Sequence, residues 1–113
     1  MSKICVITGS RAEYGLFCPL LKLLSAERGV KLQIVATSMH LSPKFGLTYR
    51  EILADGFKIS AKIKFPLPDE CGTPVSIGRA ITAIAPVLQE LKSDVVVLLG
   101  DRFETFCMAA AAQ

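Results

Sequence analysis

The residues with the clearest chemical potential lie in the segment Gly9-Ser10-Arg11-Ala12-Glu13-Tyr14-Gly15, which follows the apolar run 4–8. Ser10 and Glu13 fit a capping box, in which a hydroxyl and a carboxylate satisfy N–H groups at the start of a helix. Free backbone donors, the positive end of the helix dipole and the guanidinium of Arg11 would then meet in one turn. We therefore predict an anion site there, most naturally for a phosphate.

A second segment, Gly100-Asp101-Arg102, has a similar composition and directly follows the apolar run 94–99. Asp101 fits the N-cap of a last helix, with Glu104 completing a capping box, and a carboxylate in that position can also work as an acid or base. Arg102 would oppose the helix dipole at a cost of roughly a few tenths of a kcal/mol, which makes sense if an anion lies there. This segment is the second candidate for chemistry.

The remaining candidates each have an ordinary structural explanation. Arg11 could be a solvated arginine or a partner of Glu13, although its place just beyond a central strand favours a ligand role. His40 is the one histidine of the chain and stands apart from any cluster of metal ligands, while Tyr14 packs on a sheet more naturally than it stacks on a base. The dinucleotide fingerprint and the Walker A pattern are both absent, which disfavours NAD and ATP.

Composition limits the classes of function that remain. The 113 residues suit one globular domain, and the formal net charge of +3 comes from lysines and arginines spread along the chain. Because no basic cluster is present, we expect no nucleic-acid partner and no membrane partner. The four cysteines are irregularly spaced, and no run has the length of a signal peptide or a membrane span, so we expect reduced thiols in a soluble, cytoplasmic protein.

The two candidate segments need a scaffold that brings them together, and hydrophobic periodicity predicts one. Short apolar or alternating runs predict strands at 3–8, 31–37, 57–63 and 94–99. The last run is the most apolar and is therefore expected to be the most central. Helical patterns between and after the strands cover 11–28, 44–55, 73–91 with Thr73 as N-cap, and 103–113. Loops are expected at 38–43 and 64–72.

Regular alternation of strand and helix predicts an α/β fold with a parallel sheet and right-handed crossovers. A Rossmann-like strand order of 3-2-1-4 would place the first and fourth strands side by side. The crevice beyond their carboxyl ends is the switch point at which such sheets bind ligands. Arg11 would then face Asp101 and Arg102 across this crevice.

Together with Met39-His40-Leu41-Ser42-Pro43 and Phe45-Gly46, the two segments resemble the hydrolysing UDP-N-acetylglucosamine 2-epimerases of bacterial sialic-acid synthesis. The resemblance covers the whole chain, with the motifs in the expected order. The first and last motifs also occur in looser form in non-hydrolysing epimerases. Ser-Arg-Ala-Glu-Tyr-Gly and the Met-His-Leu segment are closer to the hydrolysing branch.

The resemblance implies a GT-B fold, in which two Rossmann-like domains enclose UDP-N-acetylglucosamine. It implies conversion to N-acetylmannosamine and UDP, by elimination of UDP across C1–C2 and addition of water with inversion at C2. No cofactor and no metal are implied, and the full-length enzyme is expected to be a homo-oligomer, a dimer or tetramer. By the same match Asp101 is catalytic, and the substrate is bound by Arg11, Gly9, Ser10, Gly15, Arg102 and His40.

The chain departs from this family in its extent. A further catalytic glutamate, a His-Gly-Gly-Glu-like motif, a later histidine and the whole second domain would lie beyond Gln113. We therefore expect residues 1–113 to form part of the N-terminal Rossmann-like domain and to be inactive alone. The fourth strand would be left as an open edge, which natural sheets avoid.

Three other interpretations remain open. One is a hydrolysing 2-epimerase for a UDP-diacetamido sugar, and another is a non-hydrolysing UDP-N-acetylglucosamine 2-epimerase. The third is not an enzyme but a flavodoxin-like or receiver-like α/β module that binds a partner. Such modules usually carry an acidic cluster or a flavin phosphate loop, and the sequence contains neither.

Overall fold

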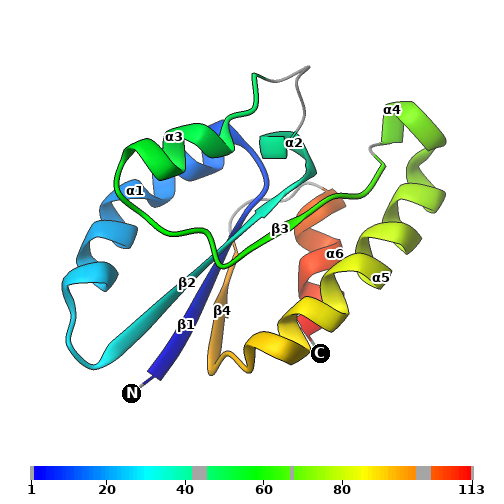
Figure 1. Cartoon of the computed structure of the whole chain (residues 1–113). Coiled ribbons are helices and arrows are strands. Elements are labelled where there is room, and N and C mark those ends of the chain that lie inside the picture. Colours follow the sequence, from blue (N-terminus) through cyan, green and yellow to red (C-terminus); the bar gives the residue numbers. More distant parts are fainter. Residues whose placement is uncertain (1, 42–45, 67, 99–102, 113) are drawn as a thin grey trace.

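The computed structural model, which describes residues 2–41, 46–66, 68–98 and 103–112, contains a parallel β-sheet between two layers of helices (Figure 1). The sheet has four strands in the order β3-β2-β1-β4, and all three neighbouring pairs are parallel. The α/β class, the parallel direction and the Rossmann-like strand order predicted from the sequence are therefore confirmed.

The elements alternate along the chain as expected. The strands are β1 (Ser2–Thr8), β2 (Val30–Thr37), β3 (Ala61–Ile63) and β4 (Val95–Val97). The helices are α1 (Arg11–Ala26), α2 (Ser38–Leu41), α3 (Tyr49–Ala54), α4 (Pro68–Cys71), α5 (Thr73–Leu91) and α6 (Phe103–Ala112).

The central strands are apolar on both faces because each face is covered by helices. Val6 and Ile34 pack in a buried cluster with Phe17 and Leu21 of α1 and Ile52 of α3. The opposite cluster contains residues of the strands, of α5 and of α6, namely Cys5, Ile7, Val35, Ile63, Ala80, Ile84, Leu88 and Cys107. The helices before β3 therefore cover one face of the sheet and α5 and α6 after it cover the other. The point at which the strand order reverses, the switch point, lies between β1 and β4.

The prediction that the fourth strand is the most central is wrong for this chain. Within the described ranges β4 pairs with β1 alone, in the register Ile4↔Val95, and Val95 is 51% exposed. Asp94 fixes the start of the pairing, since its carboxylate accepts from the Lys3 N–H at 2.7 Å and its own N–H donates to the Lys3 carbonyl at 2.8 Å. Apolar composition shows that a strand is suited to burial, but strand order decides which strands lie inside.

The third strand is shorter than the expected 57–63. Only Ala61–Ile63 pairs with β2, while Phe57 and Ile59 pack against the cluster beneath α1 and α3. Ser60 N–H donates to the Ile34 carbonyl at 2.7 Å. The alternation of apolar and polar residues therefore reflects side chains that pack inward from an irregular segment, a pattern that also occurs in strands.

The expected helix over 44–55 is reduced to α3, and residues 42–45 lie outside the described part of the chain. Gly46 and Leu47 have φ values of 81° and 51°, which cannot continue a right-handed helix. The segments expected to be loops at 38–43 and 64–72 contain the short helices α2 and α4.

The start of α5 also differs from the prediction, because Gly72 is the N-cap and Thr73 is the first helical residue. Gly72 has φ 87° and ψ 152°, a conformation that glycine adopts without the strain that a side chain brings. Ser76 then ties the helix start to the preceding segment, since its hydroxyl donates to the Pro66 carbonyl at 2.7 Å.

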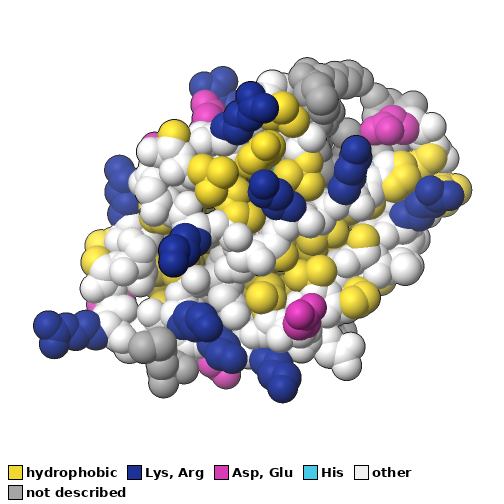
Figure 2. All heavy atoms as spheres, viewed as in Figure 1, with side chains coloured by type: hydrophobic (Ala, Val, Ile, Leu, Met, Phe, Trp, Pro, Cys, Tyr) yellow, Lys and Arg dark blue, Asp and Glu magenta, His cyan; other side chains and the backbone are white. Residues whose placement is uncertain are grey.

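Figure 2 shows the face that carries β3 and α5, where lysines and arginines are scattered as single side chains and apolar side chains gather between these two elements. No helix in the described part of the chain is long and apolar enough to cross a bilayer. The cysteines at positions 5, 18, 71 and 107 form no disulfide, as the sequence predicts.

Candidate functional site

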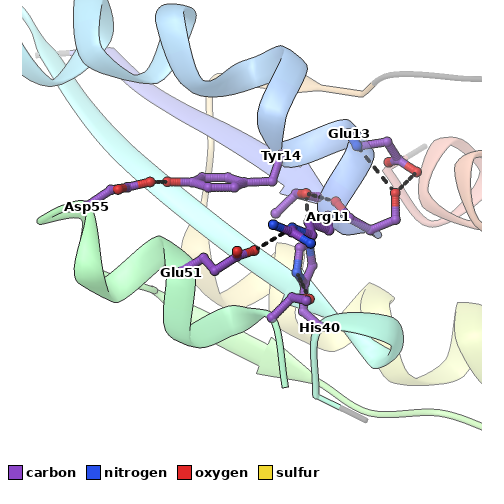
Figure 3. Close-up of polar contacts among 9 residues, drawn as sticks. Arg11, Glu13, Tyr14, His40, Glu51 and Asp55 are labelled. Carbon is purple, nitrogen blue, oxygen red and sulfur yellow. Dashed lines mark hydrogen bonds and ion pairs between the residues drawn. The ribbon is translucent and has the colours of Figure 1, made fainter. Parts of the chain in front are cut away.

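The first turn is a capping box, as predicted. Ser10 is the N-cap of α1, with extended backbone, and its Oγ accepts from the Glu13 N–H at 3.3 Å. The Ser10 hydroxyl donates to one carboxylate oxygen of Glu13 at 3.2 Å, and the Gly9 N–H donates to the other at 3.3 Å. Glu13 is only 9% exposed, so this network is internal to the turn (Figure 3).

The capping box reduces the donors that an anion can use. The N–H groups of Gly9 and Glu13 are already bonded within the turn. Within the described ranges, no protein group accepts from the N–H groups of Arg11 and Ala12, and both residues are exposed. These two donors lie at the positive end of the α1 dipole, so an anion can still bind there, although the Glu13 carboxylate nearby weakens the attraction.

Arg11 points toward α3 and pairs with Glu51 rather than with Glu13 (Figure 3). The Arg11 Nε lies 3.1 Å from a carboxylate oxygen of Glu51, and the two side chains are 73% and 42% exposed. A pair this exposed contributes only about 0–1 kcal/mol, so the guanidinium can leave it for a stronger anion. Arg11 is therefore available to a ligand.

A cleft of about 350 Å³ lies between α1 and α3, beside this ion pair. Its lining combines this pair with residues of α1 and of the end of α3 that range from buried to exposed, namely Arg11, Tyr14, Gly15, Cys18, Glu51, Ala54 and Asp55. Gly15 lies in this cleft as part of α1, and a Cβ there would meet nothing within 4 Å, so packing does not require glycine. The predicted site residue Gly15 therefore lies on α1 in the lining of this cleft, beyond the N-cap turn formed by Gly9 and Ser10.

Tyr14 packs on the sheet, as its simpler interpretation predicts. The side chain is 5% exposed in the cluster under α1, and its hydroxyl donates to a carboxylate oxygen of Asp55 at 2.5 Å. Burial, followed by the bonded carboxylate, raises the pKa of Tyr14 above its usual value. The phenol therefore stays uncharged and links α1 to the end of α3.

His40 lies in α2 and is fully buried, in contrast to the loop position expected from the sequence. Its Nε2 lies 2.9 Å from the Thr8 hydroxyl at the end of β1, and its Nδ1 lies 2.8 Å from the Thr48 hydroxyl just before α3. Burial lowers the pKa of His40 to about 4, although a hydrogen bond with the Ser10 backbone acts in the opposite direction. The imidazole is therefore neutral at physiological pH.

The second candidate segment, Gly100-Asp101-Arg102, lies outside the described residues. The structure does fix where its strand ends, because β4 runs parallel to β1 with Val97 opposite Val6. The carboxyl ends of β1 and β4 therefore lie side by side at the same end of the sheet. The expected approach of Arg11 to Asp101 and Arg102 at this end remains a prediction.

Sequence reasoning identified the turn but missed its partners. Thr8, Thr48, Glu51 and Asp55 all bond to the predicted site residues or to Tyr14. Only Thr8 carried a signal, as a polar residue that closes an apolar strand. In the part of the chain that the structure describes, no group of three or more His, Cys, Asp or Glu side chains could hold a metal ion.

Comparisons with known proteins show which family this chain is similar to. A family model described as UDP-N-acetylglucosamine 2-epimerase matches residues 22–113. Over 110 residues the chain is 41% identical to the GDP/UDP-N,N'-diacetylbacillosamine 2-epimerase (hydrolyzing) of Campylobacter jejuni, with 96% of this chain and 28% of that protein covered. Over 112 residues it is 38% identical to the UDP-N,N'-diacetylbacillosamine 2-epimerase (hydrolyzing) of Legionella pneumophila, with 97% and 30% covered.

The fold is also similar to that of solved enzymes. The UDP-GlcNAc 2-epimerase of Neisseria meningitidis, solved with UDP-GlcNAc bound, matches with a TM-score of 0.80 at 22% identity, covering 97% of this chain and 29% of that one. Such structures are of the GT-B type expected from the sequence. The chain spans about 28–30% of the length of the two curated relatives.

Proposed function

Because the chain belongs to the UDP-N-acetylglucosamine 2-epimerase family, we propose that it forms the first part of a hydrolysing 2-epimerase for a UDP-linked 2-acetamido sugar. The observation that carries this proposal is the switch point between β1 and β4, at which the turn with Arg11 is placed. Ligands of open parallel sheets bind at such a point. The remainder of the enzyme would supply the rest of the crevice, so residues 1–113 are expected to be inactive alone.

In the proposed reaction a base removes the C2 proton while the bond between C1 and the diphosphate oxygen breaks. This elimination yields UDP and a glycal, and water then adds its hydroxyl at C1 while a proton enters C2 from the opposite face. The departing diphosphate gains negative charge, which a guanidinium and helix N–H groups stabilise. We assign this role to Arg11, Arg102 and the first turn, and acid or base work at the sugar to Asp101.

The free state of the first turn is compatible with this role. Among the described residues Arg11 forms one ion pair, the exposed pair with Glu51, and the residues Arg11 and Ala12 are themselves exposed. A diphosphate carries more charge than one carboxylate and can therefore compete for the guanidinium. Gly9 and Ser10 would shape the turn around the phosphates, and Gly15 and His40 complete the set inferred from the family resemblance.

Two substrates of this class have specific support. The relatives from Campylobacter jejuni and Legionella pneumophila, at 41% and 38% identity, are named for N,N'-diacetylbacillosamine, which favours a UDP-diacetamido sugar. The family model is described by UDP-N-acetylglucosamine, which supports that sugar nucleotide as the second candidate. If the pocket accommodates one extra acetamido group, kcat/KM should be higher for the UDP-diacetamido sugar than for UDP-N-acetylglucosamine.

The test offers both sugar nucleotides to the intact protein and measures UDP release together with the configuration of the sugar at C2. We expect release from at least one of them, with an inverted free sugar as the second product. Arg11→Ala should lower kcat/KM at least about tenfold, because a charged hydrogen bond to phosphate is lost. Arg28→Ala is the matched control, since Arg28 is exposed beyond the far end of α1, and it should have no effect.

Other outcomes would identify the alternatives. Epimerised sugar that stays linked to UDP would indicate the non-hydrolysing reaction. Absence of turnover and of UDP binding by the intact protein would contradict the proposal and favour the partner-binding α/β module. The proposed homo-oligomer is tested in the same preparation by sedimentation.

A further inference from the structure

His40 has the geometry of a structural connector rather than of a substrate ligand. Its side chain has 0% exposure, so no part of the ring faces a crevice. Both ring nitrogens are bonded to hydroxyls of different elements, Thr8 at the end of β1 and Thr48 at the N-cap of α3, and the Ser10 backbone is a further hydrogen-bond partner. A buried polar ring with both nitrogens satisfied is stable as it stands and has no bond to offer a ligand.

The hydrogen-bond pattern also assigns the proton on the ring. The Thr8 hydroxyl donates to the Ser10 carbonyl at 3.3 Å, so its oxygen is left to accept from the imidazole. This pattern assigns the proton to Nε2, in which case Nδ1 accepts from the Thr48 hydroxyl. A second proton on Nδ1 would place two donors face to face unless the Thr48 hydroxyl turned away.

We infer that His40 is an uncharged positioning residue, whose imidazole joins the end of β1 to the start of α3 and so places the phosphate-binding turn against its neighbours. This role differs from the direct substrate contact that the family resemblance implies for His40. The inference rests on the proposed function only for its effect on catalysis. The tautomer and the two hydrogen bonds are properties of the fold.

The connection reaches both sides of the candidate site. On one side the Thr8 hydroxyl contacts Ser10, the N-cap on which the turn is built. On the other side Thr48 precedes α3, which carries Glu51, the partner of Arg11. Movement of the imidazole would therefore displace Ser10 and Glu51 together and change the position of the Arg11 guanidinium.

The first test measures the protonation of the two ring nitrogens of His40 in the intact protein. ¹⁵N-labelled histidine is observed by NMR at neutral pH, and His40 is assigned by comparison with a His40→Gln variant. We expect one protonated nitrogen, Nε2, and one unprotonated nitrogen, Nδ1, with the same charge state after UDP is added. A proton on Nδ1 alone, on both nitrogens, or gained when UDP binds would overturn the inference.

The second test removes the Thr48 bond without touching the histidine. Thr48→Val should raise KM for the sugar nucleotide about fivefold with little change in kcat, since one partly buried hydrogen bond is lost and the displaced turn binds the substrate and the transition state less well to the same extent. Thr48→Ser keeps the hydroxyl and should restore KM. Thr82→Val is the matched control, because the exposed Thr82 hydroxyl bonds only within α5.

The outcomes separate this inference from the proposed function. In Thr48→Val, but not in Thr82→Val, the backbone amide resonances of Gly9, Ser10 and Arg11 should shift even without substrate. If Thr48→Val leaves these amides and KM unchanged, His40 does not position the turn. If the wild type releases no UDP from either sugar nucleotide, the proposed function fails, while the amide shifts and the ring spectrum still decide the role of His40.

Discussion

Arg11 belongs to the first turn and His40 contacts the residues Thr8 and Ser10 just before it, and burial gives the two side chains opposite properties. Arg11 keeps 73% of its side chain in water, so its charge costs little and its single ion pair is easily exchanged. His40 has 0% exposure, so the imidazolium formed by a second proton would be out of contact with water and would have no carboxylate partner among the hydrogen bonds described above. One residue is therefore suited to bind an anion, and the other is suited to hold a position.

This difference predicts an acid-sensitive fold. The pKa of His40 is lowered from 6.5 to about 4, so between these pH values the unfolded chain binds more protons than the folded one. The free energy of unfolding should therefore be fully present above pH 6.5 and fall as the pH drops toward 4, by about 3 kcal/mol from this group.

Denaturant titrations of the wild type and of His40→Gln across this range measure the effect. Carboxylates titrate in both proteins, so the difference between the two pH profiles isolates the histidine. The His40→Gln profile should be flatter. Parallel profiles would show that His40 is accessible to protons in the folded state and contradict its burial.

The hydrogen-bond and ion-pair partners of the site residues were the least predictable part of the site. The capping box of Ser10 and Glu13 spans four consecutive residues, so sequence alone is sufficient to identify it. The partners Glu51 and Thr48 are brought to the turn only by the crossover from β2 to α3. No local pattern encodes such a contact, because it depends on how two helices pack on one sheet.

At the scale of elements, long periodic segments were predicted well and short ones were not. α1 and α5 run close to their expected bounds because several turns of apolar stripe define them. β3 and α3 are shorter than expected, since positive φ at Gly46 and Leu47 and the inward packing of Phe57 override the local pattern. The position of β4 depends on strand order, which hydrophobicity does not report.

The start of α1 gives an element-scale prediction. Ser10→Ala removes the acceptor of the Glu13 N–H and one donor to its buried carboxylate, and should lower the free energy of unfolding by about 1 kcal/mol or more. Ser25→Ala is the matched control, because its exposed hydroxyl bonds only to the Lys22 carbonyl, and it should change stability by less than about 0.5 kcal/mol. Equal losses in the two variants, measured by denaturant titration, would contradict the capping role.

At the scale of the whole molecule, the edge at β4 is the feature that the proposed function explains. Val95 is 51% exposed in a strand of three valines, which suits a position inside a wider sheet. We expect a further strand of the intact protein to pair with β4. Its amide hydrogen exchange should then be as slow as that of β1 and at least about tenfold slower than that of β3.

Exchange measured by NMR or mass spectrometry on the intact protein tests this expectation directly. β3 serves as the internal reference, since it is the other outer strand of the sheet. If β4 exchanges as fast as β3, its outer side is open to water in the intact protein as well. The proposal of a continued sheet would then be wrong.

The two hydrogen bonds between Asp94 and Lys3 have a consequence for the order in which the chain folds. β1 pairs with β2 and β2 with β3, which are neighbours in the sequence, whereas the bonds between Lys3 and Asp94 close a separation of 91 residues. Loop closure of that length is slow compared with local pairing. During synthesis, the nascent chain can therefore dock β1, β2 and β3 with α1 and α3 before β4 leaves the ribosome. The half of the crevice that contains Arg11 would be complete before its counterpart arrives.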